Sequence, residues 1–590
     1  MPFARTVRSS TPPAIPVPRL SSEAKIVLRK RYLIRNHQGA VSETIPQMFW
    51  RIATDIAQAE QLYPASTRLS RATRRFYESM ARLEFLPNSP TLMNAGRPLQ
   101  QLAACFVLPV EDSLSSILEA VKQQALIHQS GGGTGFSFSR LRPQDDFVSS
   151  THGIASGPVS FMRIFNMATD VVKQGGARRG ANMGILRVDH PDILEFIRLK
   201  RDQKEMTNFN LSVGLTADFM HALERGRRYS LTNPRTGKTT RQLPAQQVFD
   251  RLSEAAWASG EPGVIYLDRI NAANPTPQLG DIEATNPCGE QPLLPFESCT
   301  LGSIDVSKFV VRQQGTPAID YGRLEEAIAL AVRFLDNVID RNHYPFKEIE
   351  IATLRTRKIG LGIMGFADLL IALEIPYDSD AAIDQADGLM SFVQAHAHEA
   401  SRRLGMQRSL FPAYRGSRLQ TARERRRNAT VTTIAPTGTI SLIAGCSAGI
   451  EPLYGVHIIR RALDGLELTM IHPAFLRLIH THGLPIGMLR EELAASPSIQ
   501  HITRIPEQIR RLFVTAHDVH PTRHVRMQAA FQRYSDSGVS KTINLPSSAT
   551  TADVAEAFLL AYRLGCKGLT VFRNGSRNYQ VLSCSPAQPC

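Results

Sequence analysis

Short apolar runs alternate with segments of helical periodicity along most of this chain, and this alternation restricts its fold more than any other feature. Residues 103–109 form an apolar run that predicts a buried strand carrying Cys105. Ser113 is a favoured helix N-cap residue, and apolar side chains then recur every three or four positions until Gly131. The same alternation recurs over residues 309–366, 384–404 and 552–564. Strands that alternate with helices predict an α/β fold.

The two ends of the chain differ from this pattern. Residues 21–83 carry apolar side chains at helical spacing and predict an N-terminal helical region, whereas residues 1–20 are rich in Pro, Ser and Arg and predict a disordered tail. Residues 84–96 contain Pro and Asn and predict a loop. We expect one catalytic domain over residues 84–577 and a mobile tail over residues 578–590.

Composition excludes several classes of protein. No apolar stretch reaches the roughly 18 residues that a membrane helix needs, so we expect no membrane partner. Seven cysteines are too few and odd in number for a secreted disulfide scaffold, which favours the reducing cytoplasm. The net charge of +15 suits anionic ligands. The basic run at residues 423–427 has no aromatic residues, so we interpret it as a solvated surface and expect no nucleic-acid partner.

The turn at residues 286–290, Asn-Pro-Cys-Gly-Glu, holds the strongest chemical signal. It places the thiol of Cys288 two residues from both the amide of Asn286 and the carboxylate of Glu290. By composition alone, most intracellular cysteines are inert core thiols. An amide and a potential base beside a thiol are costly to bury unless they are used, so this turn predicts a reactive cysteine.

Two further cysteines, Cys105 and Cys299, could pair only if the fold brings them together. With the 286–290 turn they resemble the active-site plan of ribonucleotide reductases. The resemblance extends over roughly residues 20–580 and includes residues 85–96, 131–138, 157–185, 208–214, 435–452 and 540–546. It implies a ten-stranded α/β barrel built from two five-stranded halves, with Cys288 at the tip of a central finger loop.

The resemblance also implies roles for these residues. Cys288 would be the thiyl radical that takes the ribose 3′-hydrogen, Glu290 the base that accepts the 3′-hydroxyl proton, and Asn286 a residue that orients the ribonucleotide. Cys105 and Cys299 would supply the reducing equivalents and become a disulfide.

Re-reduction of that disulfide requires a mobile dithiol. Cys584 and Cys590 in the tail fit this role, with a thioredoxin-like protein as the external reductant. Their Cys-x5-Cys spacing is wider than the family usually shows, so two thiols without function remain the alternative. Four ligands at zinc spacing are absent, and we expect no structural metal.

Two loops predict nucleotide sites. Residues 436–441 combine hydroxyls with free backbone amides, a donor set that binds anions. By resemblance, the substrate-binding residues are Thr91, Ala104, Gly133, Pro287, Gly289, Pro436, Thr437, Gly438, Thr439 and Ile440. Residues 173–182 resemble the specificity loop that senses a deoxynucleotide effector at a homodimer interface. Its effector residues would be Lys173, Gln174, Arg178 and Arg179.

The radical source follows from what the sequence contains and lacks. A glycyl-radical member would carry an Arg-x-x-Gly-Tyr element near its C-terminus, and a diiron-dependent member would carry adjacent tyrosines; neither occurs here. Residues 540–546 and 568–577 resemble the cobalamin-dependent members, which implies adenosylcobalamin as cofactor and ribonucleoside diphosphates as substrates. His520 and His524 flank a Pro that disfavours a helix, so we interpret them as structural or surface residues.

Two alternatives stay open at this point. The chain could be a reductase of the same fold that depends on a diiron partner, in which case activity requires a second protein. It could also be a basic nucleotide-binding protein without catalysis, in which case Cys288→Ser would leave both ligand binding and the cellular role intact.

Overall fold

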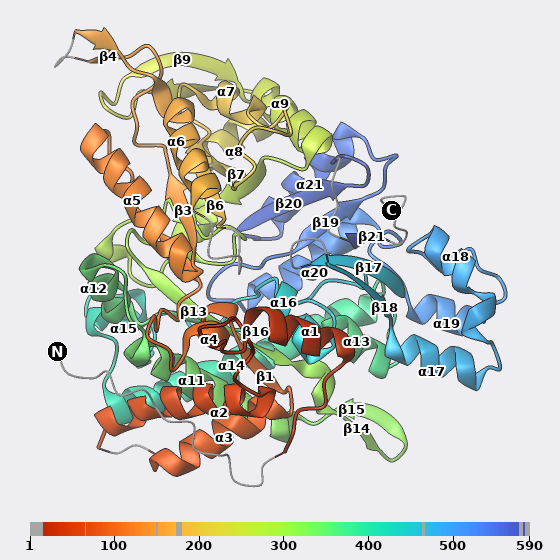
Figure 1. Cartoon of the computed structure of the whole chain (residues 1–590). Coiled ribbons are helices and arrows are strands. Elements are labelled where there is room, and N and C mark those ends of the chain that lie inside the picture. The colour runs from red at the N-terminus through yellow and green to blue at the C-terminus, as the bar shows by residue number, and fades with distance from the viewer. Residues whose placement is uncertain are drawn as a thin grey trace.

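The computed structural model describes residues 16–64, 67–148, 152–172, 180–462, 466–577 and 582–583. Its centre is a ten-stranded sheet that contains nine strands of a barrel and the short strand β1 (Phe85–Pro87) (Figure 1). Five neighbouring strands run parallel to one another and form the first half: β2 (Cys105–Val107), β3 (Gly133–Ser137), β6 (Asn182–Arg187), β7 (Phe209–Leu215) and β10 (Gly263–Tyr266). The predicted strand at Cys105 is therefore confirmed.

The second half is also parallel and closes the sheet. It consists of β13 (Ser298–Asp305), β16 (Ile359–Met364), the extended segment 431–434, β19 (Thr542–Leu545) and β20 (Gly568–Arg573). The segment 431–434 bridges to β16 at Leu361 and to Val539 just before β19. β2 pairs with β13 and β10 pairs with β20, both antiparallel. The predicted α/β barrel of two five-stranded halves is thus confirmed.

Helices cover the outside of the barrel because parallel neighbours must be joined by long crossovers. The longer ones are α5 (Leu114–Ser130), α6 (Gly157–Val171), α9 (Ala245–Ser259), α11 (Tyr321–Arg341), α14 (Asp380–Arg408), α20 (Pro521–Arg533) and α21 (Thr551–Arg563). α5 starts after the cap residue Ser113 and ends at left-handed Gly131, as predicted. One apolar core surrounds α11 and α14, and a second surrounds β6, β7 and α9. The cysteines of β2 and β13 lie in a smaller third cluster.

Shorter elements complete the chain. The short helices are α4 (Ser89–Asn94), α7 (Ile193–Arg198), α8 (Ala217–Glu224), α10 (Leu267–Ala272), α12 (Lys347–Thr356), α13 (Phe366–Ala372), α15 (Arg418–Thr421), α16 (Gly438–Ala444), α17 (Pro473–Thr481), α18 (Arg490–Ala495) and α19 (Glu507–Leu512). The small strands are β1 (Phe85–Pro87), β4 (Phe147–Val148), β5 (Gly153–Ile154), β8 (Arg228–Thr232), β9 (Thr239–Pro244), β11 (Ala284–Thr285), β12 (Pro292–Leu293), β14 (Val310–Gln313), β15 (Thr316–Ile319), β17 (His457–Ala462), β18 (Leu466–Ile471) and β21 (Leu582–Ser583).

Within the described part of residues 16–83, the α-helices are α1 (Ser22–Arg31), α2 (Ile45–Ala57) and α3 (Leu69–Ala81). α2 begins with a capping box between Thr44 and Gln47 and buries its apolar face, including Met48 and Phe49, in the core around α11. In Figure 1, α2 and α3 lie side by side beneath α11 and α14. Where the domain boundaries fall stays a prediction, and residues 578–581 and 584–590 lie outside the described part of the chain.

Two local predictions were wrong, and proline chemistry explains both. Residues 84–96 are not a loop, because Phe85–Pro87 pairs with β13 and Asn88 then caps α4, whose first turn contains Pro90. Pro521 does not prevent a helix between the two histidines, because α20 begins at Pro521, where the missing N–H would have no partner anyway; the interpretation of the histidines as structural or surface residues is unchanged. His520 is the cap, and His524 is fully buried with a hydrogen bond to the carbonyl of Ala516.

The basic run at residues 423–427 is not a solvated surface throughout. Arg426 and Arg427 are each only 5% exposed. Arg427 lies 3.5 Å from Asp336, a fully buried residue of α11 that also pairs with Arg357 and Arg408, each at 2.8 Å. We call these four residues the buried ion network. Acidic partners far away in sequence neutralise this part of the run. The composition of residues 423–427 alone therefore led to the wrong prediction of a solvated surface.

No helix in the described ranges is long and apolar enough to cross a membrane.

Candidate active site

The 286–290 turn is a finger loop held inside the barrel between the short strands β11 and β12. Asn210 of β7 donates a hydrogen bond to the carbonyl of Pro287 at 2.7 Å. On the other side, the carbonyl of Glu290 accepts from the amide of Gly538 at 2.8 Å and from the hydroxyl of Thr433 at 3.0 Å. Both halves of the barrel therefore fix the loop.

The turn itself presents Cys288 at its tip. Gly289 has a φ of +80°, which favours glycine, and its amide donates to the carbonyl of Asn286 at 3.1 Å. The side-chain oxygen of Asn286 accepts from the amide of Gln291 at 2.9 Å. Cys288 is exposed, whereas Asn286 and Glu290 are buried. This conformation leaves the thiol of Cys288 accessible, whereas the Asn286 and Glu290 side chains on either side of it are buried.

Gly135 on β3 lets the finger loop pass close to the barrel wall. A Cβ at this position would lie 1.7 Å from the carbonyl oxygen of Thr285, so Gly135→Ala must displace the loop. We expect kcat to fall by about 100-fold, because a displacement of about 1 Å in reacting groups costs that much. Gly388→Ala is the control: its Cβ meets nothing within 4 Å in α14, and kcat should not change. Steady-state kinetics of both variants test this, and an unaltered Gly135→Ala enzyme would contradict it.

Cys105 and Cys299 are direct partners across the antiparallel pair of β2 and β13, and both are free thiols. Side chains in such positions have Cβ atoms about 4.5–5.5 Å apart, slightly beyond the spacing of a disulfide. The amide nitrogen of Asn286 donates to the sulfur of Cys105 at 3.1 Å. The fold therefore brings together the finger loop and both cysteines.

Electrostatics keep both cysteines protonated. Burial raises the pKa of Cys105 well above its usual value, and the nearby carboxylate of Glu290 raises it further. Burial likewise raises the pKa of Cys299 well above its usual value, although Lys358 opposes the rise. Neutral thiols can donate hydrogen, which suits a reductive role.

A cavity of about 300 Å³ lies on one side of the finger loop, and we call it the nucleotide cavity after the ligand that the sequence analysis predicts for it. The sequence-predicted residues that line it are Ala104, Cys105, Gly133, Asn286, Pro287, Cys288, Glu290, Pro436, Thr437, Gly438, Thr439 and Ile440. Thr91 does not line it, because its hydroxyl is buried and donates to the carbonyl of Leu102 at 3.0 Å. Asn88, Ser89 and Ser303 line it instead, and sequence reasoning missed all three.

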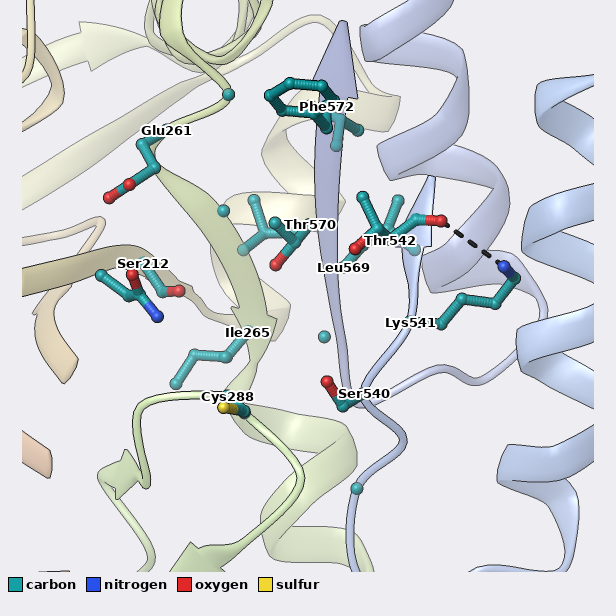
Figure 2. Close-up of a pocket in the computed structure, with 18 of the residues that line it drawn as sticks. Ser212, Glu261, Ile265, Cys288, Ser540, Lys541, Thr542, Leu569, Thr570 and Phe572 are labelled. Carbon is teal, nitrogen blue, oxygen red and sulfur yellow. Dashed lines mark hydrogen bonds between the residues drawn. The ribbon is translucent and has the colours of Figure 1, made fainter. Parts of the chain in front are cut away.

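A second cavity of about 480 Å³, the distal cavity, lies on the other side of the finger loop. Pro287 and Cys288 line both cavities, and Gly289 lines only this one. Figure 2 shows Cys288 and Ser540 at one end of the distal cavity and Glu261 and Phe572 at the other. Cys288 is therefore placed to react with groups in either cavity.

The predicted effector residues Lys173, Gln174, Arg178 and Arg179 lie outside the described residues, as do Cys584 and Cys590 of the tail. The structure does place α6 directly before the effector loop and β6 shortly after it. The proposed roles of these six residues stay predictions.

A closed barrel with one thiol on a central loop and two more on adjacent strands defines an enzyme that carries out redox chemistry on an enclosed substrate. The chain belongs to the ribonucleotide reductase family: residues 103–572 match the family model "Ribonucleotide reductase, barrel domain" and residues 19–100 match "Ribonucleotide reductase, all-alpha domain".

Individual relatives agree with this assignment. The chain is 47% identical to a vitamin B12-dependent ribonucleoside-diphosphate reductase of Thermoplasma acidophilum, over 97% of this chain and 81% of that protein. It is 49% identical to the protein of the same description from Mycobacterium tuberculosis, over 97% and 82% of the two chains. Among solved structures, the Actinobacillus ureae class Id ribonucleotide reductase alpha subunit has a similar fold, with a TM-score of 0.77 at 22% identity and coverage of 94% and 97%.

Proposed function

We propose that this chain reduces ribonucleoside diphosphates to 2′-deoxyribonucleotides by thiyl-radical chemistry at Cys288, with adenosylcobalamin as the radical source. The observation that carries the proposal is the position of Cys288 between two cavities. The nucleotide cavity contains Cys105, a potential base and a potential phosphate loop. The distal cavity leaves room for a second ligand in contact with the same sulfur. The relatives, described as vitamin B12-dependent ribonucleoside-diphosphate reductases, support both the cofactor and the diphosphate.

One wall of the distal cavity offers a hydrogen-bonding group that would hold a cobalamin. Gln528 lines the cavity and is 1% exposed, yet its Oε1 has no hydrogen-bond partner among the described residues. This orphaned acceptor suits the amide groups at the rim of a corrin. When bound, adenosylcobalamin supplies a radical by homolysis of its cobalt–carbon bond.

Within the nucleotide cavity, each of several residues of the chain would carry out a different step of the reaction. The sulfur radical of Cys288 takes the 3′-hydrogen while Glu290 accepts the 3′-hydroxyl proton. The 3′ radical weakens the bond from C2′ to oxygen, and a proton from Cys105 lets the hydroxyl leave as water. Cys105 and Cys299 together supply two electrons and two hydrogens and become a disulfide, and Cys288 returns its hydrogen to C3′. Asn286 orients the substrate.

We also propose that two copies associate through α5 and α6, which contact each other at one edge of the molecule (Figure 1). These helices expose several large apolar side chains, namely Leu114, Leu118, Leu126, Ile164, Met167 and Val171. Exposed apolar patches of this kind mark interaction surfaces. The loop after α6 would then bind a deoxynucleotide effector at the interface, and the tail cysteines would pass electrons from a thioredoxin-like protein in the cytoplasm.

Light scattering tests the homodimer. The unaltered protein should have twice the mass of one chain, and the double variant Leu118→Glu/Met167→Glu should have the mass of one. Met406→Glu changes an equally exposed methionine on α14 and should leave the dimer intact. A monomeric unaltered protein, or a dimer that survives the double change, would refute this interface.

The activity is tested by measuring deoxynucleotide formation from each of the four ribonucleoside diphosphates with dithiothreitol, with and without adenosylcobalamin. We expect product only with the cofactor, and faster reaction with diphosphates than with triphosphates. Product that instead requires an added diiron protein would favour the partner-dependent alternative. Nucleotide binding without product under all conditions would favour the non-catalytic alternative.

A further inference from the structure

A buried ion pair lies next to the Cys105–Cys299 pair. Lys358 and Glu297 have side chains only 1% and 2% exposed, and the Nζ atom of Lys358 lies 2.6 Å from Oε2 of Glu297. The carboxylate of Glu297 also accepts hydrogen bonds from the amide of Leu294 and the hydroxyl of Thr356, each at 2.7 Å. Burying a lysine with its carboxylate carries a large desolvation cost, so such a pair is weak evidence for a purely stabilising role.

The strand register places Lys358 beside Cys299. β13 and β16 are parallel, and Thr300 of β13 pairs with Ile359 of β16. Cys299 directly precedes Thr300, and Lys358 directly precedes Ile359. Cys299 and Lys358 are therefore neighbours. On the opposite edge of β13, Cys299 is the antiparallel partner of Cys105. A row across β2, β13 and the start of β16 therefore contains Cys105, Cys299 and Lys358.

The two cysteines differ in access and in their charged neighbours. Cys105 lines the nucleotide cavity, whereas Cys299 is fully buried and does not. After burial itself, the largest effect on the pKa of Cys299 is the lowering by the Lys358 ammonium. At Cys105 the corresponding effect is a further raising of the pKa by Glu290. The ammonium beside Cys299 thus favours a thiolate there, whereas the Glu290 carboxylate disfavours one at Cys105. A neighbouring charge that stabilises the departing thiolate makes that thiol the better leaving group in disulfide exchange.

We propose that Lys358 is a positioning residue for re-reduction: it makes Cys299 the leaving group, so that an incoming thiolate attacks the sulfur of Cys105 from the nucleotide cavity. The proposal rests on the proposed function, in which these cysteines form a disulfide at each turnover. The attack breaks the Cys105–Cys299 bond, forms a mixed disulfide on Cys105 and releases Cys299 as a thiolate beside Lys358. The second thiol of the reductant then displaces Cys105, and both cysteines take up protons. The reductant dithiol is oxidised to a disulfide, and the protein disulfide is reduced.

The site of attack can be located directly. A Cys288→Ser protein, in which the finger loop cannot react, is oxidised with diamide and then mixed with glutathione. The reaction is quenched with acid, and the adduct is mapped by peptide mass spectrometry. We expect glutathione on Cys105 and a free thiol at Cys299. Glutathione on Cys299 would overturn the proposal.

The role of the Lys358 ammonium is tested in the Cys288→Ser protein by removing either the positive charge of Lys358 or the negative charge of Glu297. Lys358→Met should slow reduction of the Cys105–Cys299 disulfide by dithiothreitol by about tenfold, because loss of the ammonium raises the pKa of the leaving thiol. Lys358→Arg should restore most of the rate. Glu297→Gln should accelerate reduction, because Glu297 raises the pKa of Cys299. If Lys358→Met does not fold, Lys358→Met/Glu297→Gln replaces both charges and should still reduce slowly.

A merely structural role predicts that Lys358→Met and Glu297→Gln slow the reaction alike, and that result would overturn the proposal. A failure of the proposed function looks different. In that case, the unaltered enzyme incubated with its substrate in the absence of reductant would form no Cys105–Cys299 disulfide. That result would not depend on the reduction rates measured for the diamide-oxidised variants.

Discussion

Replacing Cys288 by Ser is expected to lower deoxynucleotide formation by at least about 10⁴-fold, the range seen when an enzyme loses its essential nucleophile. The change is nearly isosteric, and Cys288 is exposed at the tip of a loop whose anchors are Asn210, Thr433 and Gly538. The fold should therefore survive. The substitution removes the S–H bond. This bond is similar enough in strength to a ribose C–H bond for hydrogen to pass reversibly between sulfur and carbon, whereas the O–H bond of Ser is much stronger.

The measurement is product formation per chain over a single turnover with prereduced enzyme, with nucleotide binding measured in parallel. Binding should persist, because Cys288 is one of many residues around the nucleotide cavity. Cys566→Ala is the matched control: this cysteine is buried in the core around α9 and α21, and turnover should be retained. If Cys288→Ser still forms product at a rate near that of the unaltered enzyme, the radical assignment is wrong.

How far the sequence predicts this site depends on how local each signal is. The 286–290 turn was recognisable because its thiol, amide and carboxylate lie within five consecutive residues. The partnership of Cys105 with Cys299 came only through family resemblance, because it depends on the register of two strands almost 200 residues apart. Ser303 gave no signal of its own. It lies in β13, whose residues are all buried, so burial alone did not mark it as a residue of the nucleotide cavity.

Contacts between distant segments also bear on two other predictions. The family resemblance assigned Thr91 to the substrate, whereas α4 directs its hydroxyl to Leu102 and leaves Asn88 and Ser89 at the cavity, so the role of Thr91 stays a prediction. The basic run at residues 423–427 looked solvated because Asp336, the residue that neutralises part of it, is about 90 positions earlier on α11. Long-range charge pairing cannot be read from local composition.

The buried ion network around Asp336 gives the second large prediction: Asp336→Asn should lower the free energy of unfolding by about 3–5 kcal/mol, the usual cost of breaking a buried ion pair on one side. Asp336 is fully buried and pairs with Arg357 and Arg408 at 2.8 Å. Arg408 also pairs at 2.8 Å with Glu60, which follows α2 in the N-terminal region. Removing the central negative charge leaves buried guanidinium groups without compensation and weakens the contact between the N-terminal helices and the barrel.

The pH dependence of this effect identifies its origin. Burial alone would raise the pKa of Asp336, but Arg357, Arg427 and Arg408 outweigh burial and hold that pKa well below its usual range. Because the folded-state pKa is depressed, the stabilisation is fully present above the unfolded pKa of about 4 and is lost as the pH falls below it. Denaturant unfolding of both proteins at pH 7 and at lower pH should therefore show a difference that shrinks on acidification. Glu78→Gln, which removes an exposed pair with Arg74 on α3, is the control and should cost less than about 1 kcal/mol. An equally small effect of Asp336→Asn at pH 7 would show that the network contributes no more than a surface pair.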